Sequence, residues 1–165
     1  MRETLADVYE RAYADKLDGA FRSRGRFLER LDTHLERPGT ELVAAYKSNE
    51  LIGYIYGFPL PNDSGWWRGF EGELPPEVAQ VTAEGAVRAI AELMVVPEQR
   101  RQGVARRLHD SLMETWHGGG LATMLVDPAN APARLAYVSW GWELLGYLKP
   151  FPDSPRFEAR VLREV

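Results

Sequence analysis

Hydrophobic residues in the first forty positions recur every three or four residues, which is the spacing of one buried helix face. They are Leu5, Val8, Tyr9, Ala12 and Tyr13 in a first run, and Phe27, Leu28, Leu31 and Leu35 in a second. The first run predicts a helix over residues 3–16, and the second predicts a helix that ends before Arg37. We expect these two helices to cover a sheet.

After residue 40 the pattern changes to short runs rich in aromatic and β-branched residues, which favour strands. Residues 41–46 and 51–58 flank a polar turn and predict an antiparallel hairpin. Further strands are expected over residues 86–96, 121–126, 142–148 and 157–162. The chain therefore contains several short strands, and these alternate with helices in its second half.

Two more helices separate the later strands. The first has an apolar stripe that repeats every four positions, at Val104, Leu108, Leu112 and Trp116. The second begins after Asn130, whose side chain can cap a helix, and ends at Gly141. The predicted order is ααββ(insert)βαβαββ, an α+β fold with a mixed central β-sheet flanked by helices. At 165 residues, the chain is expected to form a single domain over residues 1–165.

The insert covers residues 59–85, which is long for a connection between two strands. It contains several prolines and glycines, and a short helix is expected near residues 77–82. Trp66, Trp67 and Phe70 either line a pocket for a ligand or anchor the insert to the core. The sequence leaves both interpretations open.

A basic turn joins the strand ending at Val96 to the helix that follows it. Its sequence is Arg100-Arg101-Gln102-Gly103-Val104-Ala105, after Leu93-Met94-Val95-Val96-Pro97. Gly103 has no Cβ and Ala105 is small, so an anion can approach the backbone N–H groups closely. The first helical turn leaves those N–H groups without internal partners, and the peptide dipoles favour negative charge there. The turn therefore predicts a phosphate site.

This turn resembles the coenzyme A pyrophosphate loop of the GNAT superfamily of N-acetyltransferases. The signature of that loop, Q/R-x-x-G-x-G/A, follows a hydrophobic strand, and Arg100, Gly103 and Ala105 match its first, fourth and sixth positions. Asn130 and Tyr137 stand where the family often has a coenzyme-contacting asparagine and a tyrosine proton donor. The resemblance covers roughly residues 40–162.

The resemblance implies a GNAT-like acyl-CoA N-acyltransferase fold that uses acetyl-CoA as cosubstrate. Backbone groups of Leu93, Met94 and Val95 would bond the pantetheine arm, in a cleft between the strand at 86–96 and the strand at 121–126. The other residues expected to bind the coenzyme are Arg100, Arg101, Gln102, Gly103, Val104, Ala105, Arg106 and Asn130. The family usually has a strand before its first helix, and here that strand is either absent or replaced.

Tyr137 is the candidate general acid. A phenol with an ordinary pKa of about 10 is protonated at neutral pH and can donate its proton to the leaving sulfur. The alternative interpretation is a core aromatic residue, on the helix face that it shares with Trp140. The match to the family's asparagine and tyrosine favours the donor role.

Glu92 is the candidate general base, because it stands immediately before Leu93-Met94-Val95. Some related aminoglycoside acetyltransferases have an acidic residue before the equivalent segment, where it is proposed to act directly or through water. A glutamate on a strand can instead be solvated or paired with arginine or lysine. Glu84 and Asp127 are the next candidates for the base.

Composition limits the other classes of protein. A formal net charge of −4 gives no basic field for nucleic acid, and the absence of cysteine excludes a disulfide framework or a thiolate metal site. The histidines, His34, His109 and His117, have no metal-ligand spacing, so no metal is expected. The chain lacks a long apolar run and begins without a secretory signal, so we expect no membrane partner and a cytoplasmic location.

The sequence thus predicts an acetyl-CoA-dependent N-acetyltransferase that works by direct attack of a primary amine in a ternary complex. A small-molecule acceptor is favoured, because a long aromatic insert would tend to close a cleft. A peptide or protein acceptor stays open, as do a noncatalytic acyl-CoA sensor and a structural domain in which Gly103 only shapes a turn. The resemblance also allows a homodimer, which is common in the family.

Overall fold

The computed structural model describes residues 1–16, 20–118 and 120–163. Their contacts form two compact units. Unit 1 contains Met1–Phe58 and Ala91–Trp116, and unit 2 contains Pro59–Ile90 and His117–Val165. That the whole chain acts as a single domain stays a prediction.

The described residues form a mixed six-stranded sheet in the order β1-β2-β3-β4-β6-β5. The strands are β1 (Glu41–Lys47), β2 (Glu50–Pro59), β3 (Val87–Val95), β4 (Leu121–Val126), β5 (Glu143–Leu148) and β6 (Phe157–Arg163). The β1–β2 hairpin is antiparallel, β3 pairs with β4 in parallel, and β6 is antiparallel to both β4 and β5. The predicted strands, hairpin and fold class are therefore confirmed.

Strand β3 belongs to both units. Its parallel register with β4 covers Val87–Ile90, in unit 2. Its last five residues, Ala91–Val95, belong to unit 1 and lie outside that register. The strand residues expected to bond the coenzyme, Leu93, Met94 and Val95, are therefore all in unit 1.

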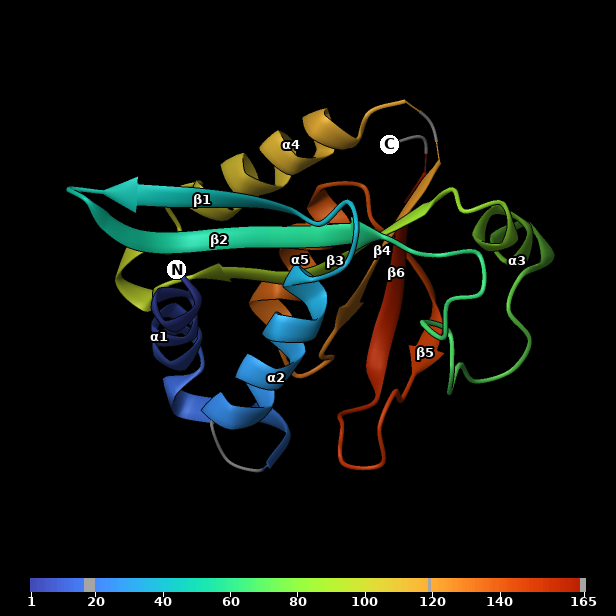
Figure 1. The fold of residues 1–165 in the computed structure, drawn as a ribbon, viewed down its shortest axis with the longest axis horizontal. Helices are drawn as coiled ribbons and strands as arrows, with labels where there is room; N and C mark the ends of the chain where they lie inside the picture. The colour runs from blue at the N-terminus through green and yellow to red at the C-terminus, as the bar shows by residue number, and fades with distance from the viewer. Residues whose placement is uncertain (17–19, 119, 164–165) are drawn as a thin grey trace. The chain divides into compact units, whose positions relative to one another are not determined.

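Unit 1 places helices on both faces of its strands (Figure 1). The helices are α1 (Arg2–Ala12), α2 (Arg24–Leu35) and α4 (Val104–Trp116), with α1 and α2 on one side of β1 and β2 and α4 on the other. Alternate residues of β2 face the two sides. Tyr54 faces α1, where its hydroxyl donates to the Leu5 carbonyl at 3.2 Å, while its neighbour Gly53 faces Leu108 of α4. The first two helices therefore cover the strands as predicted.

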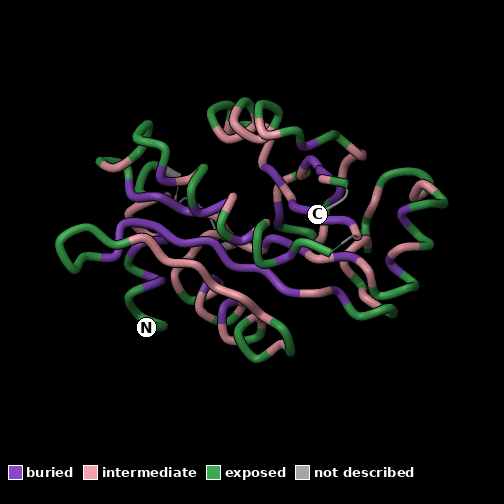
Figure 2. Tube along the Cα trace, turned by 90° about the horizontal axis from the view of Figure 1, so that it is seen from above, coloured by how far each residue is buried: buried purple, intermediate pink, exposed green. Residues whose placement is uncertain are grey.

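The helix boundaries follow the apolar spacing with one difference. Helix α1 ends at Ala12, four residues earlier than predicted, and a short 3-10 turn follows over Ala14–Lys16. The predicted apolar stripe of α4 is confirmed, since Val104, Leu108, Leu112 and Trp116 are all buried. Figure 2 colours the chain by burial, and it shows buried residues concentrated along the central strands and exposed residues in the turns.

Unit 2 contains the insert, with helix α3 (Pro76–Ala83), and helix α5 (Ala131–Ser139). Trp67 donates from its indole nitrogen to the Thr82 hydroxyl at 3.0 Å. Phe70 forms a β-bridge with Leu148, and its ring lies over Gly146 so closely that a Cβ there would be 2.6 Å away. Trp67 and Phe70 therefore anchor the insert within unit 2, which supports the packing interpretation for these two residues. That they or Trp66 line a pocket stays a prediction.

Candidate active site

The predicted phosphate loop is an exposed turn at the start of α4. A 3-10 turn over Pro97–Gln99 follows β3, and the chain then adopts positive φ at Arg101 (59°) and Gly103 (76°) before the helix begins at Val104. Positive φ is uncommon for a residue with a side chain, so Arg101 marks a sharp change in the direction of the backbone. Alternating conformations of this kind turn successive N–H groups toward one side, which favours an anion.

The start of α4 leaves several N–H groups before the first helical hydrogen bond. The first bond of the helix runs from the Arg107 N–H to the Gly103 carbonyl at 3.1 Å. The N–H groups of Val104, Ala105 and Arg106 precede it and point toward the helix N-terminus, where the helix dipole is positive. Gln102 and Gly103 are exposed, so a phosphate can reach these groups from solvent.

Arg107 is a residue of this loop that the sequence analysis missed. Its guanidinium donates to the Gln102 carbonyl at 3.2 Å and lies 3.1 Å from the point where a Cβ on Gly103 would stand. Arg107 is exposed, so its long side chain is able to move toward an anion. Arg107 stands four residues after Gly103, which is one helical turn, and this spacing in the sequence could have indicated that its side chain lies near the loop.

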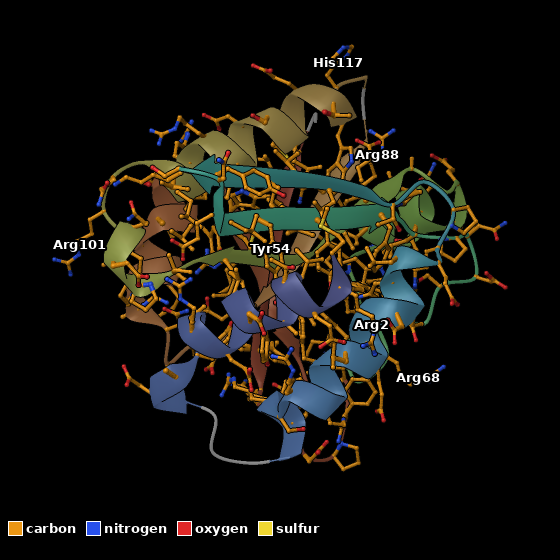
Figure 3. All side chains as sticks on the ribbon, turned by 60° about the vertical axis from the view of Figure 1, so that its left-hand side comes forward. Arg2, Tyr54, Arg68, Arg88, Arg101 and His117 are labelled. Carbon is orange, nitrogen blue, oxygen red and sulfur yellow. The ribbon has the colours of Figure 1, made fainter. Side chains whose placement is uncertain are left out.

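The predicted loop arginines have three different roles. Arg100 donates to the carbonyls of Val95 (3.1 Å) and Ala12 (2.8 Å), so its charge holds the end of β3 to the end of α1. Arg101 is exposed and points away from the protein (Figure 3). Arg106 pairs with Asp110 at 2.8 Å on the surface of α4. The helix dipole and Arg107 are thus better placed than Arg100 to complement a phosphate at the predicted loop.

Glu92 lies on β3 among tyrosines of the α1–α2 side of unit 1. It shares a strand face with Met94, whose sulfur contacts the Tyr54 hydroxyl at 3.6 Å. Electrostatic interactions link Glu92 to Tyr9, Tyr54 and Tyr56, and the pKa of each phenol is raised, chiefly by burial. We define the Glu92 cluster as Tyr9, Arg30, His34, Tyr54, Tyr56 and Glu92.

Burial raises the pKa of Glu92 to about 7, and Arg30 and Arg22 oppose the shift. Part of the residue is still exposed, so solvent and a substrate have access to it. Within the described part of the chain, Glu92 forms no hydrogen bond and no ion pair. Arg30 and Arg22 interact with Glu92 only electrostatically, and a carboxyl with a pKa near 7 suits a general base. Its role as the base, against that of a solvated glutamate, stays a prediction.

The two runner-up carboxylates have structural partners. Glu84 ends α3 and accepts a hydrogen bond from Gln80 at 3.0 Å. Asp127 accepts from the Ala129 N–H at 3.0 Å and so shapes the turn after β4. Glu92 differs from both, because it forms no hydrogen bond and no ion pair with the described residues.

Asn130 and Tyr137 lie two turns apart on α5, in unit 2. Asn130 caps the helix, because its side-chain oxygen accepts from the Ala133 N–H at 3.4 Å. Tyr137 is half-buried, and its ring meets Trp140 edge-on, with centroids 5.5 Å apart. The aromatic contact expected of Tyr137 is present, and a half-exposed phenol is also able to reach a ligand. Its role as the acid stays a prediction.

The structure thus groups the expected site residues in two sets. Glu92, the strand residues 93–95 and the phosphate loop belong to unit 1, while Asn130 and Tyr137 belong to unit 2. Among the described residues, no group of histidine, aspartate or glutamate side chains has the geometry of a metal site. The described helices include none that is long and apolar enough to cross a membrane.

Comparisons with known proteins bear on the family and the fold of the chain. The model of the acetyltransferase (GNAT) family matches residues 2–142. No curated protein sequence matches the chain. Solved structures do match, although their low sequence identity makes this a likeness of fold alone.

A GNAT-family protein from Desulfovibrio desulfuricans is 18% identical, with a TM-score of 0.66, covering 99% of this chain and 94% of its own. The ribosomal-protein-S18-alanine N-acetyltransferase of Escherichia coli is 13% identical, with a TM-score of 0.64 and coverages of 99% and 87%. The PaiA N-acetyltransferase of Thermoplasma acidophilum, in complex with coenzyme A, is 12% identical, with a TM-score of 0.63 and coverages of 98% and 92%. With the family model spanning most of its length, this chain belongs to the acetyltransferase (GNAT) family.

Proposed function

We propose that this protein transfers an acetyl group from acetyl-CoA to the primary amine of a small molecule, by direct attack in a ternary complex. The phosphate loop supports coenzyme binding, because Gly103 is exposed and has no Cβ, and α4 begins immediately after it. The backbone of Leu93, Met94 and Val95 and the cap residue Asn130 bind other parts of the coenzyme.

Glu92 acts as the general base in this proposal. A free alkylamine has a pKa near about 10 and is protonated at neutral pH, so a proton must leave before the nitrogen can attack. Glu92 takes that proton directly or through water. The nitrogen then forms a bond to the acetyl carbon while the carbon–sulfur bond breaks. Tyr137 donates its phenolic proton to the leaving sulfur, which gives the free thiol of coenzyme A. The nitrogen loses its second proton as the amide forms, and this proton passes through water to the Tyr137 phenolate, while Glu92 releases its own proton to solvent.

The observation that carries the proposal is the environment of Glu92. A noncatalytic sensor needs the phosphate loop but has no need of a carboxyl that is partly exposed, lacks a partner and has a pKa of about 7. Such a group is costly to keep, and this favours an enzyme over a sensor or a structural domain. A peptide acceptor is the second candidate, because a structural neighbour is named for acetylating ribosomal protein S18.

The test is a screen of small amines and short peptides with acetyl-CoA, read by thiol release and by product mass. We expect turnover with at least one small amine, and micromolar or tighter binding of acetyl-CoA by calorimetry is a separate readout. Binding of acetyl-CoA without turnover on any acceptor would favour a sensor. Turnover on peptides alone would replace the small-molecule acceptor with a peptide.

A further inference from the structure

Arg30 is the cation of the Glu92 cluster. It interacts electrostatically with four titratable groups: His34 on its own helix, and Tyr9, Tyr56 and Glu92 on three other elements. Arg30 lies on α2, and Arg22, in the 3-10 turn over Ala20–Arg22 that precedes this helix, also interacts with Glu92. A cation is therefore built into the surroundings of the proposed base.

The position of Arg30 is fixed by aromatic and main-chain contacts. Its guanidinium lies 4.9 Å from the centre of the Phe21 ring and donates to the Phe21 carbonyl at 3.0 Å. It also lies beside the Tyr9 hydroxyl. No carboxylate of the described chain forms an ion pair with Arg30. An arginine stacked on a ring keeps N–H groups directed to the side, where a planar anion can bind.

Arg24, on the same helix, has the opposite surroundings. It pairs with Glu3, Asp7 and Glu10 of α1, at 2.8, 2.9 and 2.5 Å. Among the described residues, three carboxylates thus pair with Arg24 and none pairs with Arg30, although both arginines are half-buried. This difference indicates that the partner of Arg30 comes from outside the described chain.

The charges of the Glu92 cluster also favour an anionic ligand. Burial lowers the pKa of His34 to about 4, so this histidine is neutral at physiological pH, and the three phenols are neutral as well. Glu92, with a pKa of about 7, is only partly ionised at neutral pH. Arg30 therefore carries a positive charge that the cluster balances incompletely, and a half-buried charge of this kind is stabilised by an anion.

We propose that the acceptor amine also carries a carboxylate, which Arg30 binds while the amine faces Glu92, so that the substrate is a small amino-acid-like molecule. This inference rests on the function proposed above. A carboxylate suits the site because its two oxygens match the fork of a guanidinium. A peptide N-terminus has an amide in place of the carboxylate and would lack this contact.

The test compares amino acids with their own amides, which keep the amine and lose only the negative charge. For wild-type protein and acetyl-CoA, we expect kcat/KM for the acid to exceed that for the amide by roughly 10- to 100-fold. Phosphonate analogues of the same amines separate a carboxylate site from a general anion site. Equal kcat/KM values for acid and amide would overturn the inference and leave the proposed function intact.

Arg30→Gln is the variant that assigns the preference to this residue. Because Arg30 also opposes the raised pKa of Glu92, its loss affects the rate with both substrates, and the informative quantity is their ratio. We expect the acid-to-amide ratio of kcat/KM to fall close to one in the variant. Arg26→Gln is the matched control, because Arg26 lies on the same ring, 5.8 Å from its centre, one turn earlier on α2. A preference that survives in Arg30→Gln, or that is lost equally in Arg26→Gln, would contradict the assignment.

A binding measurement keeps the inference separate from catalysis. Calorimetric titration with the N-acetylated amino acid, the product of the proposed reaction, needs no turnover, and we expect Arg30→Gln to weaken that binding by roughly 10-fold.

If Arg30→Gln fails to fold, Arg30→Lys is the second variant, because it keeps the charge but lacks the fork of the guanidinium. Its acid-to-amide ratio of kcat/KM must fall between the wild-type ratio and one. Product binding that depends on Arg30 without any turnover would refute the proposed function and support the site. Product binding that is indifferent to Arg30 would refute the site.

Discussion

Two glutamates on strands, Glu92 in unit 1 and Glu158 in unit 2, have opposite surroundings. Glu158 is 1% exposed and forms ion pairs with Arg160 and Arg134, each at 2.9 Å. Arg160 in turn donates to the Trp142 carbonyl. Glu92 keeps some exposure, has tyrosines around it, and forms no ion pair among the described residues. One carboxylate is fully compensated, and the other is left able to gain and lose a proton.

The same side chain thus has a structural role at Glu158, in an ion pair, and a proposed chemical role at Glu92, in proton transfer. A buried ion pair is costly to break, because removal of one partner leaves the other charge buried alone. A carboxyl without a partner is destabilising when it ionises, and is retained where proton transfer needs it. Replacement of the two glutamates should therefore change the free energy of unfolding in opposite directions.

The largest effect is expected for Glu158→Ala. This change leaves the guanidinium of Arg160, which is 7% exposed, without its carboxylate, and should lower the free energy of unfolding by about 3–5 kcal/mol. Urea denaturation measures this loss. The control is Glu143→Ala, whose carboxylate is 63% exposed beside Arg163 and whose removal should cost less than about 1 kcal/mol. Similar losses in the two variants would show that burial does not increase the cost of breaking the ion pair.

Glu92→Gln should lower turnover by roughly 10²- to 10³-fold, because the amide is unable to accept a proton. The wild-type rate at saturating acetyl-CoA should rise with pH through about 7, as the carboxyl of Glu92 ionises. In the variant this rise should be absent. Steady-state kinetics from pH 5.5 to 8.5 measure both effects, with Glu84→Gln as the carboxylate control. A wild-type profile that is flat across this range would remove Glu92 from the mechanism.

Tyr137→Phe should lower turnover by roughly 10²-fold with little change in affinity for acetyl-CoA, because only the donated proton is lost. This variant tests whether a residue of unit 2 takes part in proton transfer. Thiol release and calorimetry give the two readouts. The ring contact with Trp140 is kept in the variant, so its stability should stay near that of wild type. An unchanged rate would leave the acid–base chemistry to unit 1.

Glu92→Gln should also stabilise the protein at alkaline pH. The folded pKa of about 7 lies above the unfolded value of 4.5, so the folded state holds more protons between these values and its stability falls as pH rises through them. The variant lacks this loss and should be more stable than wild type by about 2–3 kcal/mol at pH 8, and by little at pH 4.5. Urea melts at the two pH values test this, and a constant difference would count against a raised pKa.

The smallest effect is expected at Gly103. Gly103→Val places a Cβ beside the backbone N–H groups and imposes a side chain at φ 76°, which should weaken acetyl-CoA binding by roughly 10-fold while the fold persists. Gly72→Val is the control, because Gly72 of unit 2 has a similar φ of 81° and open space around it. Calorimetry compares the two, and equal affinity in both variants would argue against the phosphate loop.

Local patterns predicted most of the fold. The four-residue stripe at Val104 to Trp116 gave α4 its correct ends, and the family signature located the turn at Gly103. Such features depend on neighbours within one or two helical turns. The insert was different: that Phe70 lies against Gly146 depends on a pairing between distant segments, and spacing within the insert contains no information about it.

The candidate site was only partly predictable for the same reason. Glu92 was chosen from its position before Leu93, but its lack of a partner and its tyrosine neighbours come from α1 and β2. Arg30 and Glu158 were not singled out, because an arginine on a helix and a glutamate on a strand look the same in sequence whether paired or not. Charge compensation is a property of the folded packing.

The double hydrogen bond of Arg100 has a consequence for protein engineering. This guanidinium donates to the last carbonyl of α1, at Ala12, and to the carbonyl of the last residue of β3, Val95, shortly before the predicted phosphate loop. Shortening α1, or rotating it about its axis to change the surroundings of Tyr9, would break the hydrogen bond from Arg100 to Ala12 and make the following turn more mobile. A library that varies α1 therefore has to hold Ala12 in place, or replace Arg100 together with it.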